Sequence, residues 1–253
     1  MRMHTKRLAL LWVLVAFACA TRPEPEPKPA AARPKGESVV HEGTYTDIQR
    51  GPGADYCKQM DQASDLMKQG HLAEAEPLVD TMLAQFGPMI EKEGGIPVSV
   101  ANQEQFNAVR DASDTPDRLV ALDWCYRELL HWKAFIKAGQ EDYPAALRVL
   151  DDEVRSAPTA AAPYVERGYI LNRMGRSAEA KRSYEHALEI AEKYAPSSPD
   201  VPVALRGLGY SLIELGDLDA AEIAFNKSLM VEPGNQVAQR ELGYIRQLRA
   251  KAQ

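Results

Sequence analysis

The chain has 253 residues, of which 45% are hydrophobic and 26% charged, as in an ordinary globular protein. Its formal net charge is −6, with 30 basic and 36 acidic side chains and no basic stripe. Such a chain cannot replace the counterions of a phosphate backbone, which argues against a nucleic-acid-binding protein. It also has little electrostatic attraction for anionic membrane surfaces.

The first 18 residues have the pattern of a secretory signal. Arg2, Lys6 and Arg7 precede an unbroken apolar run at residues 8–18, and small residues, charge and proline follow. As a helix, this run would span about 16 Å, whereas the hydrocarbon core of a bilayer is about 30 Å thick. We therefore expect residues 1–18 to be the signal peptide of an exported protein rather than a membrane-spanning or core helix.

Cys19 suggests a lipid anchor. Residues 16–19, Ala-Phe-Ala-Cys, resemble the lipobox of bacterial lipoproteins, in which the cysteine becomes the acylated first residue. The stretch departs from that pattern at Ala16, where leucine is preferred, and at Phe17, where a small residue is preferred. Cleavage without lipid, giving a soluble periplasmic protein, is the alternative. Because Ala20 is not the aspartate that often retains lipoproteins in the inner membrane, the resemblance implies the outer membrane, with the chain facing the periplasm.

Residues 19–53 carry no pattern of a folded core. Prolines alternate with charged residues over much of the segment 21–38, a composition that favours extended polyproline II. At about 3.1 Å per residue, residues 20–36 would span roughly 50 Å. We expect this segment to be a disordered tether that holds a folded domain, residues 54–253, away from the membrane.

Residues 202–235 contain the strongest periodic pattern of the sequence. Small and apolar residues share one helical face, Gly216 and Asp217 interrupt the helix, and a second amphipathic segment ends at Pro233. The marker residues are Leu205, Leu208, Gly209 and Leu212 in the first segment and Ala221, Phe225 and Ser228 in the second. Here Gly209 would let two helices approach, with Phe225 packed between them. This unit closely resembles the tetratricopeptide repeat, 34 residues that form two antiparallel helices.

The same pattern recurs elsewhere in the chain. The unit at about 161–201 has its markers 41 residues upstream: Tyr164, Gly168, Leu171, Gly175, Ala180, Tyr184 and Ala187. More degenerate units cover about 56–89 and 127–160. Residues 236–253 repeat the start of a helix pair, and their polar exposed side indicates a capping helix. The resemblance implies an all-α fold, an α-α superhelix or tetratricopeptide-repeat solenoid.

Residues 90–118 do not fit a repeat and form an insertion. Gly94, Gly95 and Pro97 predict a loop. Ser99 is expected to cap a short helix that continues through Asp111, with its apolar residues turned inward. Pro116 then predicts the start of a long helix that ends near residue 138.

The sequence shows no catalytic or metal-binding motif. Its histidines lie in different segments without a ligand spacing, and the acidic run at residues 151–153 is expected to be solvated helix surface. We therefore expect no enzyme, no cofactor and no metal. The alternative is an envelope enzyme or a metal- or ligand-binding protein with its site in residues 90–140, built from Trp124, Cys125, His131 and Trp132.

The two cysteines after Cys19 are candidates for a disulfide. Cys57 and Cys125 each lie near the start of the first helix of a repeat, and such helices are neighbours in these arrays. They could pair in an oxidising periplasm. Two separately buried thiols are the alternative.

The resemblance also predicts a partner-binding groove. In tetratricopeptide arrays the first helices line a concave groove that takes a peptide, and the residue after the first-helix glycine usually faces it. The predicted groove residues are Tyr169, Asn172, Arg173, Arg206, Tyr210, Arg240 and Tyr244. Tyrosine and arginine are good interface anchors. We expect a locally basic patch that binds an acidic or carboxylate-bearing segment of another protein; packing of the tyrosines between helices is the alternative. The implied function is a non-catalytic interaction scaffold of the cell envelope.

Overall fold

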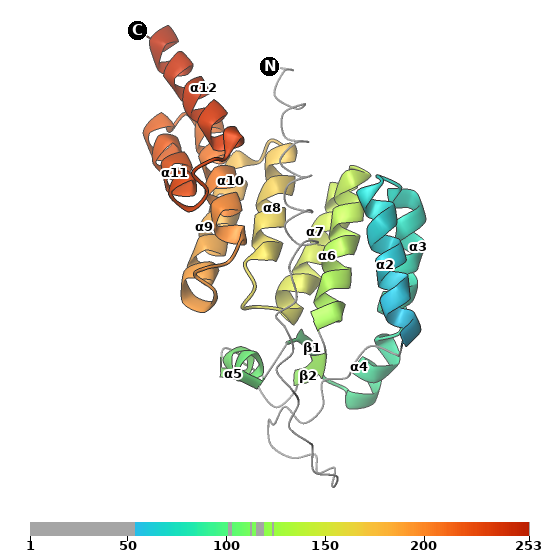
Figure 1. The fold of residues 1–253 in the computed structure, drawn as a ribbon. Helices are drawn as coiled ribbons and strands as arrows, with labels where there is room; N and C mark the ends of the chain where they lie inside the picture. The colour runs from blue at the N-terminus through green and yellow to red at the C-terminus, as the bar shows by residue number, and fades with distance from the viewer. Residues whose placement is uncertain (1–53, 101–102, 112, 115–118, 123, 253) are drawn as a thin grey trace.

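The computed structural model describes residues 54–253 apart from residues 101–102, 112, 115–118, 123 and 253 (Figure 1). The predicted signal peptide, Cys19 and the tether lie outside the described residues. Within the described part of the chain, no helix combines the length and apolar character needed to cross a membrane.

The described chain is a stack of antiparallel helix pairs (Figure 1). The pairs are α2 (Ala54–Lys68) with α3 (Leu72–Ala84), α6 (Trp124–Gly139) with α7 (Tyr143–Ser156), α8 (Ala162–Arg173) with α9 (Ser177–Tyr194), and α10 (Asp200–Glu214) with α11 (Leu218–Val231). Neighbouring pairs pack through α3 on α6, α7 on α8 and α9 on α10, and α12 (Gln236–Ala252) packs on α11. The predicted α-α superhelix is confirmed.

The turns within the pairs use a residue in the left-handed backbone region. Gly70, Gly175 and Gly216 have φ of 80°, 73° and 82°, which glycine adopts without steric cost. In the α6–α7 turn the same conformation falls on Glu141, with φ of 62°. The nearest glycine, Gly139, lies two residues before Glu141 and is still the last residue of α6.

Close packing between helices depends on glycines that face aromatic rings. A Cβ on Gly209 would lie 2.7 Å from Cε2 of Phe225, so the predicted approach of α10 to α11 is confirmed. Tyr184 of α9 packs in the same way against Gly168 of α8, where a Cβ would lie 2.7 Å from its Cζ, and against Gly207 of α10. One buried ring therefore links three consecutive helices, and only a side chain of one hydrogen leaves room for it.

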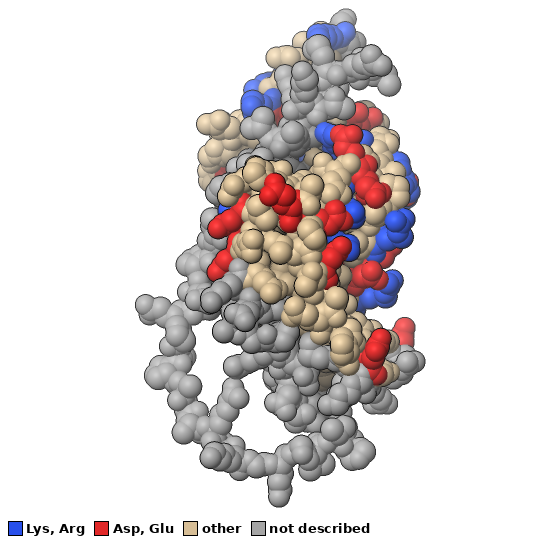
Figure 2. Space-filling model, turned by 90° about the vertical axis from the view of Figure 1, so that its right-hand side faces the viewer, with Lys and Arg blue, Asp and Glu red and all other residues tan. Residues whose placement is uncertain are grey.

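Two departures from the repeat pattern in α6 have a structural reason. Lys133 and Lys137 stand where apolar residues are usual, and they form ion pairs with Asp80 and Glu76 of α3. Gln140 adds a hydrogen bond of 2.7 Å from its Nε2 to Glu76 Oε2. Figure 2 shows that basic and acidic side chains are interspersed on the face of the molecule that lies at the right in Figure 1.

The insertion differs from its prediction. It contains α4 (Gly87–Glu93), β1 (Ile96–Ser99), α5 (Gln103–Asp111) and β2 (Leu119–Leu122). The strands pair in parallel, with Ile96 opposite Leu119 and Ser99 opposite Leu122. The predicted loop is present at Gly94 and Gly95, but Pro97 lies in β1, and the predicted long helix begins at Trp124 rather than at Pro116. Residues 119–122 are apolar, and their burial alternates from one residue to the next, which is the period of a strand. They pair with β1, and α6 therefore begins only at Trp124.

The short helix expected in the insertion is present as α5, with Phe106 and Val109 buried as predicted. Its start is Gln103 rather than Ser99. The Ser99 hydroxyl instead accepts a hydrogen bond of 3.2 Å from the backbone N–H of Arg127, in the first turn of α6. The insertion therefore satisfies a first-turn amide of a repeat helix.

Candidate functional site

The three predicted groove tyrosines lie on successive first helices of the array. Tyr169 belongs to α8, Tyr210 to α10 and Tyr244 to α12, and all three are half-buried. Burial raises the pKa of Tyr169, and it raises that of Tyr210 to about 12. Each tyrosine is therefore partly packed and partly exposed, so the packing role and the surface role are compatible.

Arg206 does not take part in a basic surface patch. Its side chain is only 5% exposed, because the guanidinium is directed to α11, where it donates to Ser228 Oγ at 3.2 Å and forms an ion pair with Glu232. Arg240 of α12 is exposed. The predicted pair of arginines on one face is therefore wrong: one of them ties α10 to α11.

The charge beside Tyr210 is negative rather than positive. Tyr210 is hydrogen-bonded to the Glu214 carboxylate, and the charges of Glu214 and Glu241 add to burial in raising its pKa. Tyr244 lies close enough to act on Tyr210 in the same direction. This end of the first-helix surface thus presents aromatic rings and carboxylates together.

Asn172 is also an internal contact. It is 7% exposed, and its Nδ2 donates to Ser211 Oγ at 2.9 Å, which joins α8 to α10. Arg173 is half-buried, and its Nε donates to the Tyr143 hydroxyl at 3.2 Å. The expected surface role of Asn172 is therefore wrong, since its polar atoms are used between helices.

The cysteine pair stays a prediction. The side chain of Cys57 lies outside the described residues, and Cys125 is half-buried against the core around α3 and α6. Of the other residues considered for a site in 90–140, Trp124 is exposed, and Trp132 Nε1 donates to Glu128 Oε1 at 2.8 Å.

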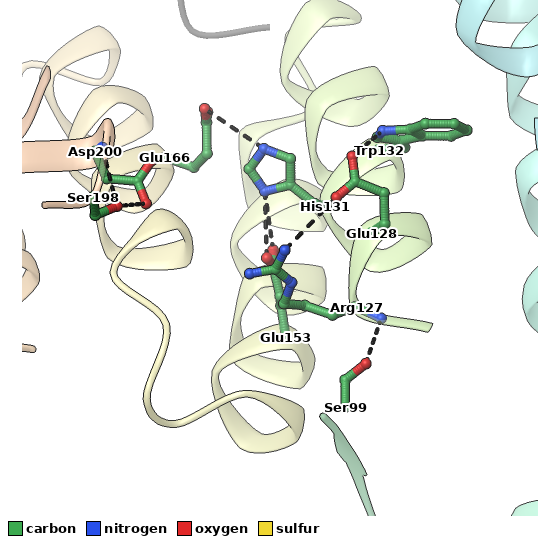
Figure 3. A network of polar contacts seen from close by, with 9 residues as sticks. All are labelled: Ser99, Arg127, Glu128, His131, Trp132, Glu153, Glu166, Ser198 and Asp200. Atoms are coloured by element: carbon green, nitrogen blue, oxygen red, sulfur yellow. Dashed lines mark hydrogen bonds and ion pairs between the residues drawn. The ribbon is translucent and has the colours of Figure 1, made fainter. Parts of the chain in front are cut away.

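His131 lies in a buried ionic cluster that sequence reasoning did not find (Figure 3). Its Nδ1 is 3.3 Å from the Glu153 carboxylate of α7, and its Nε2 is 4.0 Å from Glu166 Oε1 of α8. Glu153 is completely buried, and Glu166 is 4% exposed. The expectation that residues 151–153 are all solvated surface is therefore wrong for Glu153.

The cluster has more negative than positive groups. Burial alone would lower the pKa of His131, but the nearby Glu153, supported by Glu166 and Glu128, raises it to about 10. Burial raises the pKa of Glu166 to about 7; Glu153 and Asp200 act in the same direction, and His131 opposes them. Glu153 Oε1 and Glu166 Oε2 are buried without a hydrogen bond within the described structure.

One sequence signal could have revealed the cluster. Glu153 follows Ala146 and Leu150 at helical spacing, so it lies on the buried stripe of α7. A charged side chain on the buried stripe of a helix needs a partner of opposite charge, and His131 supplies one from the neighbouring helix. In the part of the chain that is described, no group of three or more His, Cys, Asp and Glu side chains has an arrangement that could hold a metal ion.

Comparisons with known proteins agree with the helix pairs. Residues 159–230 match the family model described as tetratricopeptide repeat. Similar solved structures include the first TPR domain of human RPAP3, at 22% identity over 49% of this chain and 93% of that one, with a TM-score of 0.45. Another is the thermophilic TPR protein TTC0263 of Thermus thermophilus, at 18% identity over 75% and 98%, with a TM-score of 0.41.

A third similar structure is a kinesin light chain with TPR-like repeats from Podospora anserina, at 15% identity over 79% of this chain and 97% of that one, with a TM-score of 0.46. These identities concern the fold alone. The search of curated proteins gave no match. The matched segment covers nearly all of α8 to α11, so the chain contains tetratricopeptide repeats and has the fold of a tetratricopeptide-repeat solenoid.

Proposed function

We propose that this protein is a non-catalytic scaffold that binds a peptide segment of another protein on the face formed by α8, α10 and α12. The observation that carries the proposal is the match of residues 159–230 to the tetratricopeptide repeat, a module whose general role is protein–protein interaction. Half-buried tyrosines on consecutive first helices support the choice of face, because a partly fixed ring offers contact area at little entropic cost.

The partner chemistry follows from which side chains remain at the surface. Arg240 is exposed, whereas Arg206 is neutralised inside the array and Tyr210 lies beside two carboxylates. A uniformly acidic ligand would meet repulsion at that end of the face. We therefore propose that the partner segment has mixed charge rather than being acidic throughout, with polar groups that the tyrosine hydroxyls and Arg240 can bind.

The cellular setting is a second part of the proposal. The charged start, the apolar run at 8–18 and the lipobox-like Cys19 support export and acylation, and residues 19–53 support a tether. A lipid-anchored scaffold at the outer membrane would hold its partner near the membrane surface. Membrane fractionation of the full chain and of Cys19→Ala tests this: the anchor predicts release of the variant, and an unchanged membrane fraction contradicts it.

Affinity capture from membrane extract tests partner binding. The baits are the full chain, Tyr210→Ala/Arg240→Ala on the proposed face, and Asn226→Ala/Lys227→Ala on the exposed side of α11 as the matched control. The proposal predicts a partner that the chain and the control retain and the first variant loses, with circular dichroism showing that all three are folded.

Equal capture by all three baits would refute the choice of face. The competing function, a metal or ligand site in residues 90–140, is favoured if no partner is captured and elemental analysis of the purified chain finds a stoichiometric metal.

A further inference from the structure

The ionic cluster occupies the junction between two parts of the array. α6 and α7 form one helix pair, and α8 begins the next after the short connection at residues 157–161. His131 comes from α6, Glu153 from α7 and Glu166 from α8, so the cluster joins all three helices (Figure 3).

The buried apolar core of this junction is rich in small residues. Three of its five buried residues are alanines, and each alanine buries little surface, with partly buried Tyr143, Leu147, Val149 and Tyr169 packed around them. The core consists of Ala134, Ala138, Ala146, Leu150 and Ile170. At its edges, Arg167 pairs with Asp151, and Arg173 bonds to the Tyr143 hydroxyl. The state of the buried charges therefore contributes to whether α8 stays on the α6–α7 pair.

The charges around the cluster do not compensate Glu166. Every packed element contributes a titratable or charged group: Arg127 and Glu128 from α6, Asp151 and Asp152 from α7, Arg167 and Tyr169 from α8, Tyr184 from α9, and Asp200 from α10. Arg127 is 3.8 Å from Glu128, and Arg167 is paired with Asp151, so both cations already have carboxylate partners. His131 is thus the one cation of this set between Glu153 and Glu166.

We propose that the His131–Glu153–Glu166 cluster is a proton-operated joint, which locks α8 onto the α6–α7 pair when Glu166 is protonated and loosens when Glu166 ionises. When Glu166 carries a proton, it is buried as a neutral group. When it ionises, its charge is buried without a cation of its own, because His131 lies between it and Glu153, with a carboxyl group on each side of the α7–α8 contact.

The direction of the pH effect follows from linkage. A raised carboxyl pKa means that the closed joint holds a proton that the opened joint releases, so closure is fully favoured below the ordinary pKa and is progressively lost as the pH rises through about 7. His131 keeps its proton until about pH 10. Closed Glu166 gives up its proton around pH 7, so between pH 6 and pH 8.5 its ionisation increases opening by about tenfold.

Amide hydrogen exchange of the full chain at pH 6 and pH 8.5, corrected for the intrinsic exchange rate, tests the joint. We expect peptides from α7 and α8 to lose about tenfold in protection relative to peptides from α11. Glu166→Gln cannot ionise and should lose less than about threefold, whereas Glu192→Gln, an exposed position on α9, should behave as the unmodified chain does.

Two results would overturn the joint. One is an equal loss of protection in α7, α8 and α11 of the unmodified chain, which needs no variant to fold. The other is an unaltered pH response in Glu166→Gln when circular dichroism shows a native helix content. Neither result concerns partner capture, so the joint and the proposed scaffold function stand or fall separately.

Discussion

At the scale of single residues, the glycines of this chain have two separable roles. Gly216 supplies a left-handed turn and has no heavy atom within 4 Å of an added Cβ, whereas Gly209 has an ordinary helical backbone and faces a ring. The sequence pattern predicts both positions as glycine without distinguishing the reasons. Substitution by alanine should distinguish the two roles. Overpacking at Gly209 can be relieved by a second substitution that makes the facing side chain smaller, whereas backbone strain at Gly216 cannot.

The left-handed turn gives a first prediction. Gly216→Ala should lower the free energy of unfolding by about 1–2 kcal/mol, because a Cβ is unfavourable at positive φ. Gly234→Ala is the control: this glycine has an open surrounding and no positive φ, so the change should be within about 0.5 kcal/mol. Urea unfolding of both variants measures the difference. Equal effects would show that strain at Gly216 is not responsible.

The ring contact gives a second prediction. Gly209→Ala should cost about 1–3 kcal/mol, since its Cβ would lie 2.7 Å from the Phe225 ring. Phe225→Leu alone should also destabilise, but in the double variant the smaller side chain should accept the added methyl. A double-mutant cycle measures this coupling, and strictly additive costs would contradict the proposed contact.

At the scale of elements, the repeats and the short helix α5 were predictable from the sequence, whereas the strand pair of the insertion was not. Helices α8 to α11 follow from glycine, alanine, aromatic and proline residues at fixed spacing, which local periodicity records. Parallel pairing of β1 with β2 joins segments separated by α5, and no local pattern fixes such a partner. The apolar residues 119–122 fit both a helix start and a buried strand, so only the tertiary contact decides.

The candidate site shows the same limit. The tyrosines could be placed on α8, α10 and α12 from repeat phase alone. Phase could not tell that Arg206 reaches Ser228 and Glu232, since both acceptors lie beyond the turn that follows α10. The repeat pattern indicates on which helix face a side chain begins. The partner of a long charged side chain also depends on which acceptors the adjacent helix places within its reach.

The contact between the insertion and α6 gives a third prediction. Ser99→Ala removes the acceptor of the Arg127 backbone N–H and should cost about 1 kcal/mol, the usual value for a lost helix N-terminal cap. Exchange of the first-turn amides of α6 should rise while exchange in α11 stays unchanged. A uniform rise throughout the chain, or none at all, would contradict a local capping role for Ser99.

At the scale of the whole molecule, the buried cluster predicts how stability depends on pH. The pKa values of His131 and Glu166 are both raised in the folded chain, so the folded state binds more protons than the unfolded state at neutral and alkaline pH. Their combined stabilisation is complete only below the ordinary pKa of a carboxyl group. It declines as the pH rises, through about 7 for Glu166 and towards about 10 for His131.

Thermal unfolding therefore gives a fourth prediction. The melting temperature of the full chain should fall by roughly 5 °C or more between pH 6 and pH 9, given about 2–4 °C per kcal/mol for a chain of this size. Circular dichroism at several pH values measures it, and Glu166→Gln should show a shallower decline. A melting temperature that rises between pH 6 and pH 9 would contradict the proton linkage described for the cluster.

The most direct test of the central claim, that α8, α10 and α12 form the partner-binding face, is site-specific photo-crosslinking in the native cell envelope. The photoreactive residue p-benzoylphenylalanine replaces exposed Gln247, one turn after Tyr244 on α12, or exposed Lys227 on α11 in otherwise identical full chains. We expect a discrete crosslinked protein from position 247 and none from position 227. Crosslinking from position 227 alone, or an equal yield from both positions, would contradict it.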